Sequence, residues 1–245
     1  MKKWNDLERK YEIKKGIYAK YGKRAFDLLA SIIGGLIISP VILALCILSR
    51  IILGSPIFFV QKRTGKDEKT FNMIKFRSML DTRNENGELL PDRDRLTKYG
   101  DFLRRTSLDE LPEIINVIKG DMSLVGPRPL FPFYLPYYNE KESIRHSVRG
   151  GITGLAQING RALLKWDERF KKDFEYVKKI TFWGDIKILL GTIEKVFKKE
   201  DIGILSITEE GGLHVVREVQ RPEYLLRECD TDPNKPKFEQ GTKDE

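Results

Sequence analysis

The longest apolar stretch of the chain runs from Leu28 to Ser49 and contains no charged residue in 22 positions. As one straight helix it would be roughly 33 Å long, which is enough to cross a hydrocarbon core of roughly 30 Å. It is too long, and starts too far into the chain, for a cleaved signal peptide, and it lacks a cleavage site of small residues. The pattern therefore predicts a membrane-embedded segment, with a buried helix of a soluble protein as the alternative.

The middle of this stretch carries a strong helix breaker, the pair Ser39-Pro40. Proline removes a helix hydrogen bond and clashes with the carbonyl four residues back, and the residue before proline is pushed away from helical geometry. A pair of glycines weakens the first half further. The pattern predicts two half-helices, Ala25–Ile38 and Val41–Leu53, each roughly 20 Å long and too short to span a bilayer alone.

Basic residues lie on both sides of the apolar stretch, from Lys2 to Arg24 before it and from Arg50 to Arg77 after it. Positively charged flanks favour the cytoplasmic side of a membrane. A crossing helix would place one of these flanks outside, whereas a re-entrant hairpin that turns at Ser39-Pro40 keeps both flanks inside. A kinked single span is the alternative, because proline is tolerated in membrane-spanning helices.

After this segment the pattern is typical of a small α+β domain that is mainly helical. The expected elements are a hairpin of Ile57–Gln61 and Thr70–Phe76, a polar loop at 81–95, helices at 109–120 and 133–148, amphipathic helices at 166–179 and 185–199, and short strands at 204–207 and 213–219. From Cys229 onward the composition is typical of a disordered tail. We expect four parts: a basic N-terminal extension (1–17), the membrane segment (18–54), a globular domain (55–203) and a C-terminal extension (204–245).

The 245 residues carry a formal net charge of +8, which favours an anionic partner such as nucleic acid, an acidic membrane surface or a phosphorylated substrate. The basic residues are not concentrated in a recognisable nucleic-acid module, so no nucleic acid is expected as a partner. Two cysteines, Cys46 and Cys229, argue against a disulfide framework, and two distant histidines, His146 and His214, argue against a histidine-rich zinc site. The familiar glycine-rich nucleotide motifs are absent, so any nucleotide must be held in another way.

Two adjacent carboxylates, Asp109 and Glu110, precede Pro112 at the expected start of a helix. The ordinary structural explanation of such acids is helix capping. Ser107 or Asp109 would be the N-cap, and Glu110 or Glu113 would complete a capping box.

Several arginines accompany these acids. Arg104 and Arg105 come just before them, Arg128 lies in the stiff turn Gly126-Pro127-Arg128-Pro129, and Arg161 follows a glycine-rich stretch. Paired acids that hold a divalent metal, together with guanidinium groups that neutralise phosphate oxygens, suit a magnesium-bound diphosphate. Each feature alone is an ordinary turn or cap, so this hypothesis rests on their combination.

Taken in order, these segments resemble the bacterial sugar transferase family, the monotopic phosphoglycosyl transferases that start glycan assembly on polyprenol phosphate. The resemblance covers about residues 18–200. It rests on the following segments, with x for any residue: Lys23-Arg24-x-Phe26-Asp27; Ser39-Pro40; Gly54-Ser55-Pro56-Ile57-Phe58-Phe59-x-Gln61-x-Arg63-x-Gly65; Lys75-Phe76-Arg77-Ser78-Met79; Leu96-Thr97-x-x-Gly100; Leu103-Arg104-x-x-Ser107-Leu108-Asp109-Glu110-Leu111-Pro112; Asn116-Val117-x-Lys119-Gly120-Asp121-Met122-Ser123-Leu124-Val125-Gly126-Pro127-Arg128-Pro129-Leu130; and Gly151-Ile152-Thr153-Gly154-x-Ala156-Gln157-x-Asn159-Gly160-Arg161.

The resemblance implies a covalent, two-step transfer that begins with a UDP-sugar. Asp109 would attack the phosphate that carries the sugar and release UMP, and undecaprenyl phosphate would then take the sugar phosphate from the enzyme. Asp109 and Glu110 would be the catalytic acids and the ligands of Mg²⁺. The same carry-over assigns to substrate binding and the active-site shell Lys75, Arg104, Pro127, Arg128, Pro129, Arg161, Asp173 and Asp185.

Within that set, the resemblance implies that Arg128 with its flanking prolines contacts the nucleotide and that Arg161 contacts a phosphate. Two of the acids also have ordinary explanations. Asp185 could be the N-cap of the last long helix, and Asp173 a solvated acid near Arg169.

The family also implies a re-entrant helix hinged at Ser39-Pro40, with the catalytic domain on the cytosolic face of the bacterial inner membrane, against an anionic bilayer, and it allows a homodimer. The spanning helices that precede this region in larger members are missing, so the short form is expected. Two departures from the family pattern, Gly150 in place of a usual proline and Leu155 in place of a usual aromatic residue, lie near the loop expected to help recognise the sugar. The competing hypothesis is a non-catalytic membrane-surface protein of the same fold, in which Asp109 and Glu110 would be replaceable.

Overall fold

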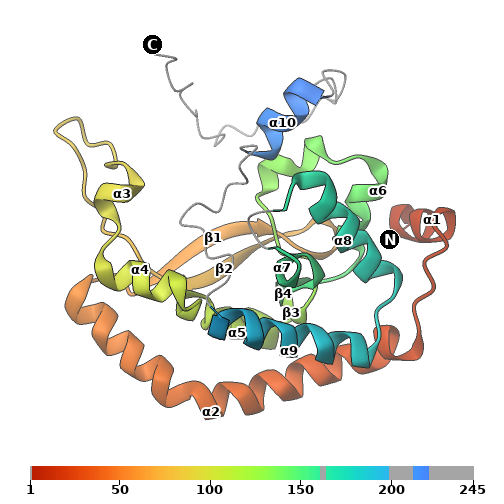
Figure 1. The fold of residues 1–245 in the computed structure, drawn as a ribbon, viewed down its shortest axis with the longest axis horizontal. Coiled ribbons are helices and arrows are strands. Elements are labelled where there is room, and N and C mark those ends of the chain that lie inside the picture. Colours follow the sequence, from red (N-terminus) through yellow and green to blue (C-terminus); the bar gives the residue numbers. More distant parts are fainter. Residues whose placement is uncertain (1, 161–163, 199–211, 221–245) are drawn as a thin grey trace.

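The computed structural model describes residues 2–160, 164–198 and 212–220. One long helix, α2, lies along one side of the molecule, and most other elements lie on its concave side (Figure 1). The first part of the chain forms α1 (Lys2–Lys10), the π-helical turn η1 (Tyr18–Gly22), α2 (Lys23–Ile52), β1 (Phe58–Thr64), η2 (Lys66–Glu68), β2 (Thr70–Phe76), α3 (Asp92–Arg95), α4 (Lys98–Arg105), η3 (Leu108–Glu110) and α5 (Glu113–Lys119). The second part forms β3 (Met122–Val125), η4 (Pro132–Tyr137), α6 (Glu140–Ser143), η5 (Ile144–Ser147), β4 (Gly150–Thr153), α7 (Leu155–Ile158), α8 (Trp166–Lys178), α9 (Phe182–Lys198) and α10 (Leu213–Gln220). The expected class, mainly helical with a small amount of sheet, is confirmed.

The helix α2 stays continuous through Pro40, so the expected break into two half-helices is wrong. Pro40 has no N–H to offer the carbonyl of Leu36. The hydroxyl of Ser39 donates a hydrogen bond of 2.8 Å to that carbonyl instead, which satisfies the acceptor that the proline leaves. Proline inside a helix is a common cause of bending, and Figure 1 shows α2 bowed around the rest of the molecule.

The helical residues Tyr18–Ile52 are long and apolar enough, by length and composition, to cross a membrane. Little of this segment is buried, unlike the core helix of a soluble protein. The side chains of Leu36 and Ile37 are 70% and 73% exposed. Contiguous apolar surfaces of this kind mark sites that contact a membrane or another protein, which supports a membrane-embedded α2.

Both ends of α2 are fastened to the rest of the protein by polar contacts. Near its start the buried Asp27 accepts hydrogen bonds from Ser123 Oγ at 2.7 Å and from the backbone N–H of Leu124 at 3.3 Å. Near its end the hydroxyl oxygens of Ser49 and Tyr99 lie 2.9 Å apart. The exposed apolar part of the helix therefore lies between two anchored ends.

Two small sheets support the domain. β1 and β2 pair antiparallel, with Phe58 opposite Phe76, which confirms the expected hairpin. β3 and β4 pair in parallel, and the sequence pattern did not predict them. After β3, the chain passes so close to a neighbouring segment that a Cβ on Gly126 would lie 2.5 Å from the carbonyl oxygen of Arg149, so glycine is required there.

The stretch 133–148, expected as one helix, is instead divided into η4, α6 and η5. Pro136 lies in η4, and Asn139 begins α6 with a capping box that includes Glu142. A proline and a strong N-cap inside the stretch favour separate short helices over one long helix.

The stretch 213–219, expected as a strand, is the helix α10. Leu213 and Val216 are buried three residues apart, which is helical spacing and not the alternation of a strand. The expected strand at 204–207, the tail from Cys229 and the predicted phosphate ligand Arg161 lie outside the described residues.

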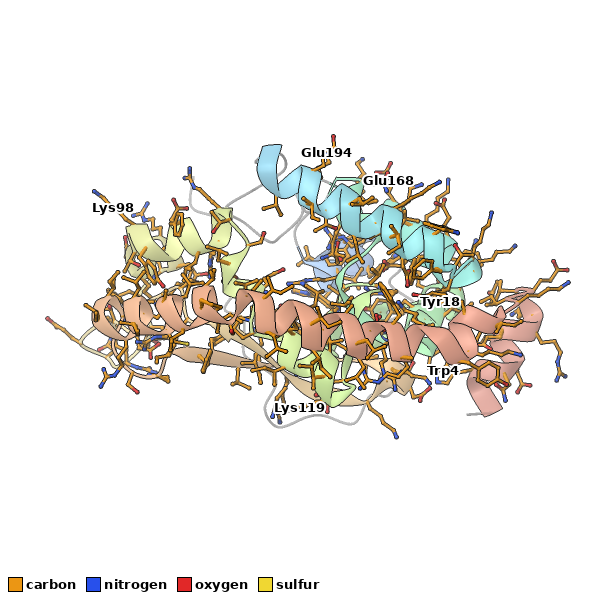
Figure 2. All side chains as sticks on the ribbon, turned by 90° about the horizontal axis from the view of Figure 1, so that it is seen from below. Trp4, Tyr18, Lys98, Lys119, Glu168 and Glu194 are labelled. Atoms are coloured by element: carbon orange, nitrogen blue, oxygen red, sulfur yellow. The ribbon has the colours of Figure 1, made fainter. Side chains whose placement is uncertain are left out.

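Seen from below, α2 crosses the width of the molecule, with α4 and α9 along one side of it (Figure 2). The amphipathic helices expected at 166–179 and 185–199 are confirmed as α8 and α9. Large exposed apolar side chains on α4 and α9 include Phe102, Phe182, Trp183, Leu190 and Ile193. Amphipathic helices beside an exposed apolar helix are suited to the surface of a bilayer.

Candidate active site

Asp109 and Glu110 lie in η3, a single helical turn between α4 and α5. The residue before this turn, Ser107, has φ 55° and ψ 18°, a left-handed backbone that is unfavourable for a residue with a side chain. Neither Ser107 nor Pro112 makes a side-chain cap hydrogen bond, so the capping explanation of the two acids is wrong. The strained turn instead presents both carboxylates beside the hairpin and the Arg128 turn.

Glu110 is held by two cations from different segments. Lys75 on β2 donates a hydrogen bond of 2.8 Å to Glu110 Oε1, and Arg128 binds the same oxygen. Burial raises the pKa of Glu110, but Arg128 and Lys75 outweigh it and lower the pKa to about 2. Glu110 is therefore ionised and fixed in position.

Asp109, in contrast, makes no hydrogen bond or ion pair with any residue that the structure describes. Burial and the neighbouring Glu110 carboxylate raise the pKa of Asp109 to about 6, against the opposing effect of nearby cations. At neutral pH the carboxylate is largely ionised, and its oxygens are free to bind a ligand or to attack an electrophile.

A third acid, Glu113, joins this cluster, although neither the sequence pattern nor the family resemblance predicted it as a site residue. Its side chain is fully buried in the first turn of α5, 3.4 Å from Lys75 and 3.3 Å from Arg128. Burial raises the pKa of Glu113 to about 7 despite the charge of Arg128. The available signal was its spacing, because residues three and four positions apart lie on one face of a helix.

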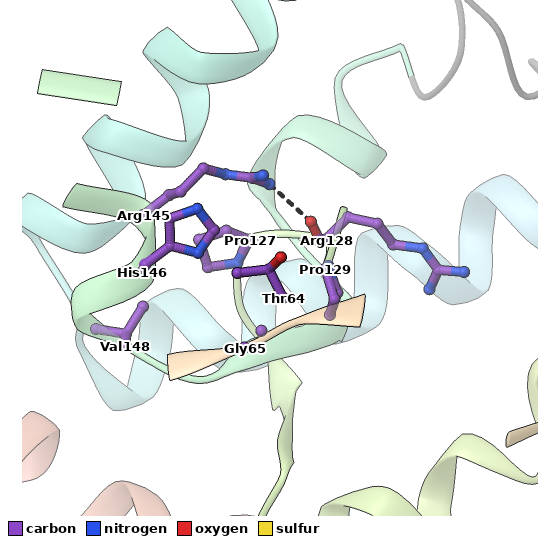
Figure 3. A pocket seen from close by; sticks show the side chains of 9 residues that line it. Thr64, Gly65, Pro127, Arg128, Pro129, Arg145, His146 and Val148 are labelled. Carbon is purple, nitrogen blue, oxygen red and sulfur yellow. Dashed lines mark hydrogen bonds between the residues drawn. The ribbon is translucent and has the colours of Figure 1, made fainter. Parts of the chain in front are cut away.

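The turn Gly126–Pro129 presents the side chain of Arg128 to the acids. Arg128 also donates to the carbonyl oxygen of Ile152 at 3.0 Å. Figure 3 shows a small cavity lined by the two prolines of the turn, with the guanidinium of Arg128 directed away from it. The cavity measures about 10 Å³, which is close to the space one water needs. Arg145, also in Figure 3, donates to the carbonyl oxygen of Arg128 at 2.7 Å and so fixes the turn from behind.

Asp173 is buried and pairs with Arg145, whose Nε and Nη2 lie 3.0 Å and 2.9 Å from Asp173 Oδ2. Asp173 is therefore not a solvated acid. Because Arg145 holds the Arg128 backbone, Asp173 supports the turn indirectly, and its hydrogen-bond partner is not a member of the acid cluster.

Asp185 is fully buried inside α9, which begins at Phe182, so the N-cap explanation is wrong. It accepts hydrogen bonds from Lys23 at 2.7 Å, from Tyr18 at 2.8 Å and from Tyr176 at 2.9 Å. These contacts join α8, α9 and the start of α2, and the structure does not pair Asp185 with the acids of η3.

Arg104 lies next to the acids, where its charge acts to lower the pKa of Asp109. Its Nε donates to Ser78 Oγ at 2.9 Å. The structure therefore brings Lys75, Arg104 and Arg128 together around Asp109 and Glu110, and these residues come from separate segments.

An apolar cavity of about 350 Å³ opens beside this cluster. Its wall includes Glu110 and Ser107 as well as Ile38 of α2. Much of the remaining wall comes from α5, α7, α9 and β4, with the side chains Ile114, Ile152, Ile158, Lys195 and Val196. The cavity thus borders both the acids and the middle of the apolar helix.

Within the described residues, no three His, Cys, Asp or Glu side chains are placed to hold a metal ion together. Mg²⁺ usually keeps waters and binds one or two carboxylates together with phosphates of a substrate. The unpaired carboxylate of Asp109 next to Glu110 fits that donor set if a diphosphate supplies the other oxygens.

Comparison with known proteins defines the class. The pattern of the family described as bacterial sugar transferase matches residues 18–199. The chain therefore belongs to the bacterial sugar transferase family, which confirms the predicted family and the predicted enzyme class, a phosphoglycosyl transferase.

The match with individual relatives covers different shares of their length. The uncharacterized sugar transferase EpsL of Bacillus subtilis is 50% identical over 180 residues, 74% of this chain and 89% of that protein. The UDP-glucose:undecaprenyl-phosphate glucose-1-phosphate transferase of Escherichia coli is 41% identical over 185 residues, 71% of this chain and 40% of that protein. The UDP-N-acetylgalactosamine-undecaprenyl-phosphate N-acetylgalactosaminephosphotransferase of Aeromonas hydrophila is 39% identical over 192 residues, 74% of this chain and 44% of that protein. The chain spans less than half of the length of the last two relatives.

Proposed function

We propose that this protein transfers a sugar 1-phosphate from a UDP-sugar to undecaprenyl phosphate and releases UMP. The names of the E. coli and A. hydrophila relatives describe transfers of this kind. The observation that carries the proposal is the contrast between two adjacent acids. Lys75 and Arg128 hold Glu110, while Asp109 has no partner in the described part of the chain. A free carboxylate beside fixed cations is suited to attack a phosphate.

The reaction would proceed by two displacements at one phosphorus atom. First, a carboxylate oxygen of Asp109 bonds to the phosphorus that carries the sugar, the bond to the bridging oxygen breaks, and UMP leaves with the electron pair. Then an oxygen of undecaprenyl phosphate attacks the same phosphorus, the bond to Asp109 breaks, and the carboxylate is restored. The product is a polyprenol diphosphate sugar, and no net proton transfer to the protein is needed.

The surrounding side chains reduce the repulsion between an anionic nucleophile and an anionic substrate. Lys75 and Arg128 are held by Glu110 and need little reorganisation when charge shifts onto the leaving group. Asp109 and Glu110 are the residues that would hold Mg²⁺, which supplies further neutralisation of phosphate charge when bound.

In this proposal the lipid acceptor reaches the site from the bilayer. The bowed α2 is anchored at both ends, which supports a re-entrant helix with both flanks on the cytosolic face of the bacterial inner membrane. The apolar cavity between Glu110 and Ile38 would receive the isoprenyl units next to the lipid phosphate. UDP-sugars would enter from the cytosol.

The test is UMP release by detergent-solubilised protein given undecaprenyl phosphate, Mg²⁺ and a panel of UDP-sugars. Release with one donor that disappears with a chelator and in Asp109→Asn would support the proposal. Asp6→Asn, at an exposed position of α1, is the matched control and should keep full activity. Undiminished release by Asp109→Asn would exclude this residue as the nucleophile, and no release with any donor would favour the non-catalytic membrane-surface protein.

The covalent step has its own test. With donor and Mg²⁺ but without acceptor, the wild-type protein should release UMP in a burst of about one per site and gain the mass of the sugar phosphate. Asp109→Asn should show neither. Release of UMP only when acceptor is present would indicate direct transfer between the substrates.

A further inference from the structure

Arg63, near the end of β1, is a half-buried arginine that forms no ion pair in the described part of the chain. One of its terminal nitrogens donates to the neutral Oε1 of Gln61 at 2.6 Å, and its buried Nε has no hydrogen-bond acceptor. Its guanidinium lies 3.6 Å from the centre of the Phe131 ring. An aromatic face attracts the cation, but it does not satisfy the N–H groups at the edge of the guanidinium plane.

This lack of a carboxylate partner distinguishes Arg63 from the half-buried Arg128 of the acid cluster and from the fully buried Arg145 and Arg217. Arg128, Arg145 and Arg217 each bind at least one carboxylate. A buried charge without a partner is costly, and such groups are found where a ligand of opposite charge binds. Phe131 is itself stacked on Phe133 with ring centres 5.1 Å apart, so the platform under Arg63 is supported.

Arg63 also lies beside the acid cluster and its arginine turn. The backbone N–H of Thr64 donates to the carbonyl oxygen of Leu130 at 2.9 Å, which attaches the end of β1 to the segment after Arg128. Burial and the positive charge of Arg128 lower the pKa of Arg63 to about 10, and the nearby carboxylates offset this only in part. Two cations that repel each other in the free protein are suited to share an anion.

We propose that Arg63 is a phosphate-binding residue that, together with Arg128, binds oxyanions of the nucleoside diphosphate donor. This inference rests on the proposed function and extends its site. A guanidinium fork binds phosphate oxygens in pairs, and stacking on Phe131 orients the fork before the ligand arrives. The lipid acceptor also carries a phosphate. Arg63 does not line the apolar cavity beside α2, however, so the donor is the expected source.

The experiment measures binding of UDP and of inorganic pyrophosphate to the full-length protein in detergent, by calorimetry. Arg63→Gln should weaken both by roughly 10–100-fold, the usual range for losing a charge-assisted hydrogen bond. Arg63→Lys should weaken them less, because lysine keeps the charge and loses the fork. Lys62→Gln is the matched control. It removes one charge from the exposed neighbouring position, which points to the other face of the strand, and should bind as wild type does.

Steady-state kinetics then separates the two sources of phosphate. A higher KM for the UDP-sugar with an unchanged KM for undecaprenyl phosphate supports the donor assignment, and the reverse would move the contact to the acceptor and overturn it. Wild-type binding of both probes by a folded Arg63→Gln would overturn the proposal. If Arg63→Gln does not fold, the test uses Arg63→Lys instead. UDP binding by that variant with wild-type affinity would overturn the proposal. If the wild-type protein releases UMP and Arg63→Gln releases it equally well, the role of Arg63 is wrong and the proposed function stands.

If pyrophosphate binding depends on Arg63 but no donor yields UMP, the phosphate-binding role of Arg63 stands and the proposed function is wrong.

Discussion

Asp109 lowers the stability of the folded protein at neutral pH, because its half-buried carboxyl lies beside the Glu110 carboxylate and has no hydrogen-bond or ion-pair partner among the described residues. Its pKa is about 6 in the folded state, against about 3.9 in an unfolded chain. As the pH rises from about 4 to about 6 the unfolded state loses this proton first, so stability falls across that window. We predict that Asp109→Asn removes the penalty and gains on the order of 1–3 kcal/mol at neutral pH.

Thermal unfolding in detergent at about pH 7.5 and about pH 5 tests this sign. Asp109→Asn should melt above wild type at the higher pH, show a smaller gain at the lower pH, and release no UMP. A variant that is less stable than wild type at the higher pH would mean that the Asp109 carboxylate has a stabilising partner, which contradicts the prediction.

Glu110 and Glu113 should respond differently to the same substitution. Glu113 has its pKa raised to about 7, so glutamine resembles a form that it already adopts at neutral pH. Glu113→Gln should therefore keep UMP release within severalfold of wild type. Glu110→Gln removes the ionised acceptor of Lys75 and Arg128 and should lower the rate by roughly 100-fold or more. Equal rates for the two variants would show that their protonation does not differ in the working enzyme.

At the scale of elements, the sequence predicted well those structures whose pattern is local. The β1–β2 hairpin and the helices α8 and α9 follow from alternation or helical periodicity in their own residues. The parallel pair β3–β4 and the helix α10 depend on partners far along the chain. Arg217 of α10, for example, is buried and forms ion pairs with Glu142 and Asp167. The residues of α10 alone give no indication of such distant ion-pair partners.

The same distinction applies to the candidate site. The resemblance named Lys75, Glu110 and Arg128, and the structure places these three side chains in contact. Glu113 and Arg63 were missed as site residues. The spacing of Glu113 from the two acids was the only signal for it in the sequence. Its full burial, and the missing carboxylate partner of Arg63 among the described residues, are visible only in the structure.

The bow of α2 gives a prediction about topology. Pro40→Ala restores an N–H for the carbonyl of Leu36 and should straighten the helix, which favours a span across the membrane. In a background without native cysteines, we would introduce Asn5→Cys and Lys66→Cys and label inside-out vesicles with an impermeant thiol reagent. Both positions should label in the parent protein, and position 5 should become protected in Pro40→Ala. Labelling of only one position in the parent would exclude a re-entrant helix.

The ion pair behind the arginine turn should matter for stability and for donor binding. Asp173→Asn leaves Arg145 buried with a weaker partner, which should destabilise the fold by up to about 3–5 kcal/mol. Because Arg145 also holds the Arg128 carbonyl, the KM for the UDP-sugar should rise. The double variant Arg145→Met with Asp173→Leu should regain stability, but its KM for the UDP-sugar should stay higher than that of wild type. Recovery of both would mean that the turn does not depend on Arg145.

At the scale of the whole molecule, the fold extends past the region that the family pattern covers. That pattern ends at residue 199, yet α10 packs into an aromatic cluster with Tyr134, Trp166 and Phe170. Leu213 and Arg217 are 0% and 1% exposed. Trp166 begins α8, so α10 contacts the element that follows the segment containing Arg161.

Arg217 is the contact that should hold this helix in place. It lies 2.7 Å from Glu142 and 2.9 Å from Asp167, and removing one partner from a buried ion pair costs about 3–5 kcal/mol. Arg217→Met should therefore lower the melting temperature and release α10 from Trp166. In a background with Trp4 and Trp183 replaced by phenylalanine, Trp166 emission should shift to longer wavelength, while the exposed control Val215→Ala leaves it unchanged. The rate of UMP release by Arg217→Met should fall severalfold, since the start of α8 loses a packing partner. Unchanged emission and melting in Arg217→Met would show that α10 contributes nothing to the stability of the domain.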